Sequence, residues 1–391
     1  MALQESDKSA VTPFLIALIN PNRCPQDRRY CMRLVTRNVV EMGDVQAREA
    51  LERWASLNND PELAAIAFEQ LYSANTAPLR AVLEKREGQL RDAHQSKQLS
   101  EFGILQEQWL PLLDGSQFPS FLWSPPPLFT VKSKTNFIRF VAFGDFGSRS
   151  KDQSEVAEAI LKLHKRQRLD FGITLGDNFY PRGAESVDDP RWQKWWEDLY
   201  GQMKIPFFVS MGNHDWLNSG SAAAEVLYSK KSKTWQLPSP YYTYVAGPAQ
   251  FFALDTTYLS EAQLAWLEDA LQKSTAQWKI VYGHHQMYSA TRGENQKLIN
   301  RLLPILKSHS VNLYVCGHDH NLQELQPDGS VHFVVAGGGG ATLYDMKQDY
   351  ARSEFKNKQH GFTVIEADRQ HLRIKFIGTD GSILYQNEIT P

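Results

Sequence analysis

The sequence contains few cysteines, no long apolar run and little net charge. Three cysteines occur among 391 residues, and only Cys316 lies near the polar clusters described below, which argues against a thiolate metal site. No run approaches the ~20 apolar residues of a membrane-spanning helix, so we expect no membrane span. The formal net charge is −2, and no nucleic-acid partner is expected for a chain so close to neutral. With 42% hydrophobic residues, the chain is expected to be soluble and globular, and larger than one ordinary domain.

Five short polar clusters are the most informative feature that remains. Each follows an apolar run typical of a buried strand, over residues 137–143, 170–175, 205–211, 278–282 and 311–316. The clusters read Gly144-Asp145-Phe146-Gly147, Gly176-Asp177-Asn178-Phe179-Tyr180, Gly212-Asn213-His214-Asp215, Gly283-His284-His285 and Gly317-His318-Asp319-His320.

Each cluster alone has an ordinary explanation, because a Gly-Asp pair after a strand is usually a turn and a single histidine is usually a core residue. Together they offer carboxylates, imidazoles, an amide and a phenol at the carboxyl edge of one predicted sheet, where open α/β folds bind their ligands. This donor set suits first-row metals such as Fe, Mn and Zn. We therefore predict a site for two metal ions.

In this order and spacing, the clusters resemble those of the purple acid phosphatases, in particular the short, tartrate-resistant kind within the metallophosphoesterase superfamily. The resemblance covers about residues 135–390 and includes Cys316 to Gln323, CGHDHNLQ. It implies an α/β fold, a four-layer metallophosphoesterase β-sandwich flanked by helices. It also implies hydrolysis of phosphate monoesters, of the acid phosphatase type, by a metal-bound hydroxide.

The resemblance assigns the metal ligands residue by residue. It implies that Asp145, Tyr180 and His320 hold the first metal ion. Asn213, His284 and His318 are expected to hold the second ion, and Asp177 is expected to bridge both.

One departure from the wider superfamily bears on the identity of the first metal. Most members have a histidine two residues after the first aspartate, and Gly147 stands there in this chain. Tyr180 is expected to fill the vacancy, and its phenolate favours a trivalent ion. We therefore expect Fe(III) together with a second divalent metal, either Fe, Zn or Mn. About five positive charges would then face about four negative ones, which favours phosphate dianions as substrates.

Four further residues are assigned to catalysis or substrate binding. His214 is the candidate general acid, and Asp215 is expected to fix its tautomer from behind. The alternative is that His214 only supports the metal ligands. His285 is expected either to contact substrate or to pack, and Arg292 stands near the place of a second substrate-facing histidine in the short family members, where it would give a fork-shaped phosphate contact.

Two other functions stay open beside the monoesterase. A phosphodiesterase could use the same metal centre, and a non-catalytic protein could bind phospholigands there. The expected substrates are small phosphorylated molecules or phosphoproteins.

The region upstream of the resemblance is helical in pattern. Residues 44–57, 61–73 and 79–94 carry apolar residues at spacings of three and four, and the prolines at 125–127 break the pattern. We predict a helical accessory domain over residues 1–125 and a calcineurin-like metallophosphoesterase domain over residues 126–391. The partner of the helical domain is not indicated by its sequence.

Location is indicated only indirectly. No signal peptide is assigned, because Glu5 and Asp7 spoil the basic flank that should precede the apolar residues 11–19. Cys24 and Cys31 are either a local disulfide or two reduced residues on one helix. Similar phosphatases are usually exported, which favours a secreted or periplasmic protein over a cytoplasmic one.

Overall fold

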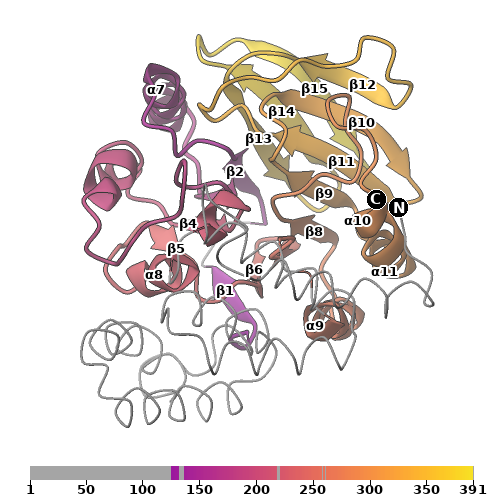
Figure 1. Ribbon diagram of the computed structural model, residues 1–391. Coiled ribbons are helices and arrows are strands. Elements are labelled where there is room, and N and C mark those ends of the chain that lie inside the picture. Colours follow the sequence, from indigo (N-terminus) through magenta and orange to yellow (C-terminus); the bar gives the residue numbers. More distant parts are fainter. Residues whose placement is uncertain (1–124, 132–135, 218–220, 258, 260, 391) are drawn as a thin grey trace, which may run out of the picture. The chain divides into compact units, whose positions relative to one another are not determined.

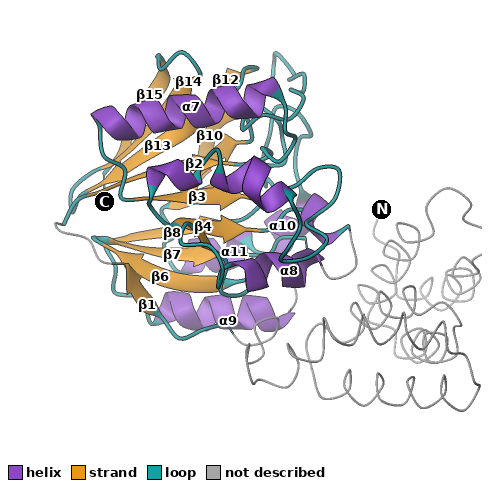
Figure 2. Ribbon diagram, turned by 90° about the vertical axis from the view of Figure 1, so that its left-hand side faces the viewer, coloured by secondary structure: helices purple, strands orange, loops and turns teal. Residues whose placement is uncertain are grey.

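Two β-sheets face each other, and helices cover their outer faces (Figure 1, Figure 2). The computed structural model describes residues 125–131, 136–217, 221–257, 259 and 261–390. The predicted four-layer α/β fold is confirmed for this part of the chain. The helical domain predicted for residues 1–125 lies outside the described residues apart from Pro125, as do Cys24 and Cys31, so these expectations stay predictions. Among the described residues, no helix combines the length and the apolarity that crossing a membrane requires.

The first sheet has seven strands in the order β15-β14-β13-β2-β3-β4-β5. Strands β2 to β5 pair in parallel, whereas β13, β14 and β15 add an antiparallel half. Their bounds are β2 Ile138–Phe143, β3 Phe171–Leu175, β4 Phe207–Ser210, β5 Trp235–Gln236, β13 Gly361–Ala367, β14 Leu372–Gly378 and β15 Ile383–Ile389.

The second sheet has eight strands in the order β1-β6-β7-β8-β9-β11-β10-β12. Its centre is parallel from β7 through β8 and β9 to β11. The bounds are β1 Phe129–Val131, β6 Tyr242–Ala246, β7 Ala249–Ala253, β8 Trp278–Tyr282, β9 Leu313–Cys316, β10 Leu322–Asp328, β11 Val331–Ala336 and β12 Ser353–Asn357.

Aromatic side chains fill the space between the sheets. Phe140 and Phe171, on adjacent strands of the first sheet, place their rings 5.1 Å and 5.3 Å from the ring of Phe251 in the second. Phe208 of β4 stacks on Tyr244 of β6 with 4.1 Å between ring centroids. Each such pair contributes about 0.5–1.5 kcal/mol beyond the burial of its apolar area, so this layer fixes how the two sheets lie against each other.

Helices of ordinary amphipathic pattern complete the outer layers. Ser150 caps helix α7 (Lys151–Arg166), because its hydroxyl accepts from the backbone N–H of Gln153. The helix buries Val156, Ile160 and Leu163, which are spaced by three and four residues. The remaining helices are α8 Ser221–Tyr228, α9 Glu261–Gln272, α10 Gln296–Arg301, α11 Leu303–Ser308, the π-helix η2 Trp192–Glu197, and the 3₁₀ turns η3 Gly201–Met203 and η4 His214–Trp216. Leucines of α9, α10 and α11 form one apolar cluster with β8, β9 and β11.

The five predicted strands are present, but the prediction that they share one sheet is wrong. Strands β2, β3 and β4 belong to the first sheet, and β8 and β9 belong to the second. All five were predicted from buried apolar runs, and such runs do not reveal which strands pair. The carboxyl ends of both sets meet: the backbone N–H of His318 after β9 donates to the Asp145 carboxylate after β2 at 2.8 Å. The polar clusters therefore face one another across the two sheets.

Candidate metal centre

Five loops bring the predicted site residues together at this edge. Each loop follows the strand that its cluster was predicted to follow. The five loops surround one common space. The loop after β2 carries Asp145, that after β3 carries Asp177 and Tyr180, that after β4 carries Asn213 and His214, that after β8 carries His284 and His285, and that after β9 carries His318 and His320.

The backbone at three of these positions is strained. Asp145, Asp177 and His318 have φ angles of 57°, 52° and 67°, in the left-handed region that residues other than glycine rarely adopt. Strain of this kind persists only where the surrounding structure holds it, and it concentrates at functional sites. Gly212 shows how tight the loops are, because a Cβ on it would lie 2.2 Å from Asp177 Oδ1.

The first group of donors surrounds the Tyr180 hydroxyl. The Tyr180 Oη lies 2.8 Å from Asp177 Oδ2, 3.2 Å from Asp145 Oδ1 and 3.1 Å from His320 Nε2. His320 Nε2 is also 3.4 Å from Asp145 Oδ1. Four donor atoms from three loops therefore point at one small volume.

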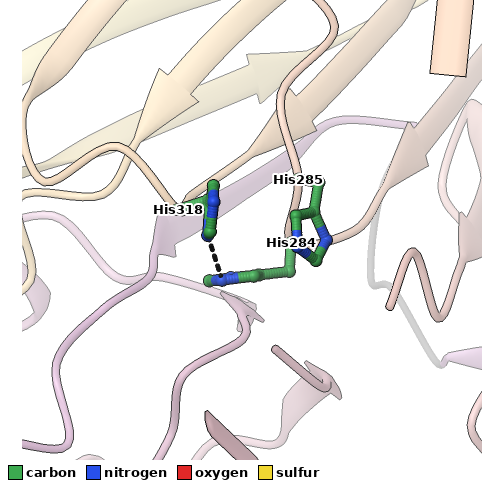
Figure 3. Close-up of side chains that lie close together, drawn as sticks. All are labelled: His284, His285 and His318. Carbon is green, nitrogen blue, oxygen red and sulfur yellow. Dashed lines mark hydrogen bonds between the residues drawn. The ribbon is translucent and has the colours of Figure 1, made fainter. Parts of the chain in front are cut away.

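The second group consists of two imidazoles and an amide. Figure 3 shows His284 and His318 directed toward each other, with His318 Nδ1 3.0 Å from His284 Nε2. The Asn213 Oδ1 is 3.2 Å from the same His284 nitrogen. Asp177 joins this group to the first, because its Oδ1 lies 3.4 Å from His284 Nε2 while its Oδ2 accepts from Tyr180.

Backbone carbonyls fix the tautomers of two of these histidines. His284 Nδ1 lies 2.8 Å from the Leu175 carbonyl oxygen, and His320 Nδ1 lies 2.7 Å from that of Thr342. A carbonyl only accepts, so each Nδ1 carries a proton, and in the neutral ring Nε2 presents its lone pair to the site. This is the form of imidazole that binds a cation.

The electrostatics of the cluster favour bound positive charge, either as protons or as a cation. Burial, followed by the charges of Asp145 and Asp177, raises the pKa of Tyr180 well above its usual value. Burial alone would lower the pKa of His284, but the Asp177 carboxylate raises it to about 9. Without metal the site therefore holds protons on groups that a metal would deprotonate. The carboxylate, phenol, imidazole and amide donors present thus fit two metal ions.

His214 is held differently from the sequence-based expectation. Its Nδ1 lies 2.7 Å from the Pro181 carbonyl oxygen, so a backbone carbonyl, in the place expected for Asp215, orients the ring. Its Nε2 is 3.9 Å from Asp177 Oδ2, next to the junction of the two groups. The ring is partly exposed, which leaves room for a ligand beside it.

Asp215 is fully buried behind the loops. Its oxygens accept from the backbone N–H groups of Asn178, Phe179 and Gly212 and from the Asn178 side-chain amide, at 2.7–3.2 Å. Burial, reinforced by Asp177, raises the pKa of this carboxyl to about 8. These bonds tie the loop after β3 to the loop after β4, and they act on the site through the backbone.

His285 is oriented by a threonine hydroxyl. Thr256 Oγ1 accepts from the backbone N–H groups of His284 and His285, at 3.2 Å and 2.9 Å, and lies 2.9 Å from His285 Nδ1. With its lone pairs engaged, the hydroxyl donates its proton to Nδ1, so neutral His285 carries its own proton on Nε2. The His285 ring lies 4.4 Å from that of His318.

Arg292 lies at the side of the first donor group. Its Nε donates to Asp319 Oδ1 at 2.7 Å, and its guanidinium carbon is 5.2 Å from the centre of the Tyr344 ring. Tyr344 in turn stacks on His320, with ring centroids 4.0 Å apart. The Arg292 side chain is 45% exposed. Its Nε is held by Asp319, while its charged end remains accessible.

Comparison with known proteins agrees with this geometry. Residues 138–322 match the model of the calcineurin-like phosphoesterase family, a range that contains all the candidate ligands. The chain is 32% identical over 304 residues to tartrate-resistant acid phosphatase type 5 of Sus scrofa, covering 66% of this chain and 89% of the relative. The chain belongs to the purple acid phosphatase family. As a member of this hydrolase family it cleaves phosphate esters on a metal centre.

Two solved structures show the same fold as this purple acid phosphatase. One is described as GAP50, the anchor in the inner membrane complex of Plasmodium, with 26% identity, a TM-score of 0.59, and coverage of 65% of this chain and 89% of that one. The other is a purple acid phosphatase from yellow lupin seeds, with 18% identity, a TM-score of 0.55, and coverage of 67% and 55%.

Some residues around this purple acid phosphatase site had no signal in the sequence. Thr256 and Tyr344 are single residues in irregular segments, and only the folded chain brings them against His285 and His320. The same is true of Pro181, which contributes a carbonyl group that every residue has. The glycine run at 337–340 is a further case, because such a run reads equally as a plain turn and as a loop that lies beside a ligand site. The structure places Gly337 there, because a Cβ on it would lie 2.7 Å from Asp145 Oδ2.

Proposed function

We propose that this protein hydrolyses phosphate monoesters with two metal ions that share Asp177. The observation that carries the proposal is the position of the Asp177 carboxylate, whose Oδ2 accepts from Tyr180 and whose Oδ1 faces His284. A carboxylate with one oxygen toward each donor group can bridge two cations. Bound there, the ions would supply a water-derived hydroxide as nucleophile and a clamp for phosphate oxygens.

The two donor groups define the ligand sets of the proposal. Asp145, Tyr180 and His320 would hold the first ion, and Asn213, His284 and His318 the second. Because burial and two carboxylates hold the Tyr180 proton in place, only a strongly charged cation would convert this hydroxyl to a phenolate. The first ion is accordingly proposed to be Fe(III), and the second a divalent Fe, Zn or Mn.

His214 is proposed to protonate the leaving group. With Nδ1 bonded to the Pro181 carbonyl, the proton that His214 can give up is on Nε2, the nitrogen beside the junction of the two donor groups. The donor is thus held at one end by the backbone and faces the site with the other. Asp215 supports this arrangement through the loops, and the Pro181 carbonyl takes the place at Nδ1 that was expected for Asp215.

Two residues are proposed to bind the phosphate group. His285 would donate through Nε2, since Thr256 supplies the proton at Nδ1. Arg292 would place its two terminal nitrogens on phosphate oxygens, because Asp319 engages its Nε and thereby fixes the plane of the guanidinium.

The decisive experiment compares two substrates on protein of measured metal content. The monoester p-nitrophenyl phosphate should be hydrolysed at least about 10²-fold faster than bis(p-nitrophenyl) phosphate, because Arg292 and His285 favour a doubly charged group. An Arg292→Gln variant is the matched control, and it should reduce the preference mainly by raising KM for the monoester. Faster turnover of the diester would assign the site to phosphodiester hydrolysis.

A non-catalytic role is the remaining alternative. The protein in the related Plasmodium structure is described as an anchor. Phosphate binding without turnover of either ester, on protein that carries two metal ions, would support a phospholigand-binding function and contradict the proposal.

A further inference from the structure

We infer that Arg191, which lies outside the metal site, positions His214 for proton donation. The inference rests on the proposed role of His214 as general acid. It concerns the loop formed by residues 181–183, which contacts His214 at two points. His214 Nδ1 donates to the Pro181 carbonyl at 2.7 Å, and the Gly183 N–H donates to the His214 carbonyl at 2.8 Å.

One guanidinium group holds this loop from the other side. Arg191 Nη1 donates to the Arg182 carbonyl at 2.8 Å, and Nη2 donates to the Gly183 carbonyl at 2.8 Å. The Arg182 carbonyl and the Gly183 N–H belong to the same peptide unit. Arg191 therefore contacts one end of a peptide group whose other end contacts His214, and hydrogen bonds in such a chain polarise one another.

The guanidinium is itself fixed on its remaining sides. Asp189 accepts from Arg191 Nε at 2.9 Å and from Nη2 at 2.6 Å, and it is buried. The rings of Phe179 and Trp195 lie 5.5 Å and 5.4 Å from the guanidinium carbon. With three nitrogens engaged and two aromatic neighbours, the guanidinium has little freedom to move. Its hydrogen bonds to the loop therefore restrict the motion of the loop as well.

Only arginine can make this set of contacts. The planar fork supplies Nε, Nη1 and Nη2 at fixed spacing, whereas a lysine has one nitrogen that would have to choose between Asp189 and a carbonyl. Arg191→Lys should therefore keep the charge and the fold but loosen the loop. A displacement of the catalytic group by about 1 Å can reduce turnover by about 10²-fold.

The test compares substrates that differ in their need for an acid. Arg191→Lys should slow an alkyl phosphate about 10-fold to 10²-fold in kcat and slow p-nitrophenyl phosphate less than about 3-fold, since a good leaving group needs little protonation. Metal content should not change. In the His214→Ala background, the same substitution should cause no additional loss that is selective for the alkyl ester.

Arg139→Lys is the matched control. Arg139 also forms a partly buried ion pair, with Glu366 at 2.6 Å, but it stands at the start of β2, the opposite end of the strand from Asp145. Its substitution should affect both substrates equally and by less than about 2-fold.

The outcomes separate this inference from the proposed function. If His214→Ala is selective for the alkyl ester but Arg191→Lys slows both esters equally, the positioning role is overturned and the acid role stands. If His214→Ala itself shows no selectivity, the acid role is overturned and the inference falls with it. If Arg191→Lys yields no folded protein, Asp189→Asn replaces it. This substitution removes the carboxylate that holds the guanidinium but keeps Arg191, and the same outcomes apply to it.

Discussion

The orientation of His214 comes from backbone carbonyl and N–H groups, which makes its chemistry testable by a single substitution. Removing the ring leaves Pro181 and Gly183 in place and keeps the His214 backbone N–H that donates to Asp177 Oδ1 at 2.9 Å, but it removes the ring that lies 4.6 Å from that of Tyr180. His214→Ala should therefore slow alkyl phosphates by the ~10²–10⁴-fold typical of general acid catalysis, and slow p-nitrophenyl phosphate much less. Steady-state turnover of the two esters measures the difference.

Metal analysis of the same variant is the control. Content equal to that of the wild type would show that the loss concerns proton transfer. Loss of metal would make His214 a support for Asn213, and equal loss on both esters would assign it to phosphate binding.

Glu324, on β10, is expected to make the stability of the folded protein depend on pH. It is buried, Oε1 accepts from Asn387 at 2.5 Å, and Oε2 has no partner among the described residues. Burial raises the pKa of this carboxyl to about 7. The folded state then binds the proton more tightly than the unfolded state, so stability falls as pH rises from about 4.5 to about 7. Glu324→Gln should remove this loss and raise the free energy of unfolding at pH 8 by roughly 2–3 kcal/mol.

Glu366 serves as a control, because its pKa is shifted in the opposite direction from that of Glu324. Burial favours its protonated form, but hydrogen bonds from Lys375 and Arg139 outweigh burial and lower its pKa. Its contribution is fully present above the unfolded pKa and is lost as pH falls through the folded pKa, so Glu366→Gln should destabilise the protein more at pH 8 than at pH 4. Denaturant unfolding at both pH values checks the pair. A Glu324→Gln gain of the same size at pH 4 and pH 8 would contradict the account.

Among the elements, the turns after β3 and β4 are packed closely against each other. Gly212 follows β4, and a Cβ there would lie 2.2 Å from Asp177 Oδ1 and 2.3 Å from Asp177 N. Gly212→Ala should push these two turns apart, at a cost of about 1–3 kcal/mol of stability. Because Asp177 is the proposed bridge, turnover should fall by about 10²-fold or more. Thermal unfolding and metal analysis measure the two effects.

Gly201→Ala serves as the comparison for this substitution. A Cβ at Gly201 would meet the end of the Glu197 side chain at 2.7 Å, and that carboxylate can turn away. Stability and turnover should stay close to those of the wild type. Similar losses in both variants would show that the site is not especially sensitive to the spacing of its turns.

The strands that carry the site were predictable because the apolar composition of each run agrees with the buried strand that it forms. The runs ending at Phe143, Leu175 and Tyr282 are buried at every position except Arg139 and Lys279, and their apolar composition predicted this burial. The polar residue after each glycine marked the strand end. These local signals gave the order of the loops and the residues that converge.

The pairing of the strands and the neighbours of the side chains were not predictable in the same way. Whether β8 joins β3 or β7 depends on contacts between residues far apart in sequence. The acceptor for His214 is the carbonyl of Pro181, and a backbone carbonyl carries no sequence signal. Asp215 was expected beside His214 because it is adjacent in sequence, yet four N–H donors from two loops engage it.

At the scale of the two sheets, each contributes a different kind of donor to the proposed centre. The first sheet supplies the anionic donors Asp145, Asp177 and Tyr180, and the second supplies His284, His318 and His320. If Fe(III) occupies the first site, a phenolate-to-iron band should colour the purified protein, and Tyr180→Phe should abolish it. A colourless wild type that contains two divalent ions would contradict the Fe(III) assignment.

The central claim is that the donors of the two sheets share one carboxylate, that of Asp177. Asp177→Asn keeps the size of the side chain but removes the charge that two cations would share. Turnover of p-nitrophenyl phosphate by this variant, on protein of measured metal content, tests the claim most directly. We predict a loss of turnover of roughly 10²-fold or more, together with loss of metal from at least one site. Retention of more than about a tenth of wild-type turnover with both metals bound would contradict the account.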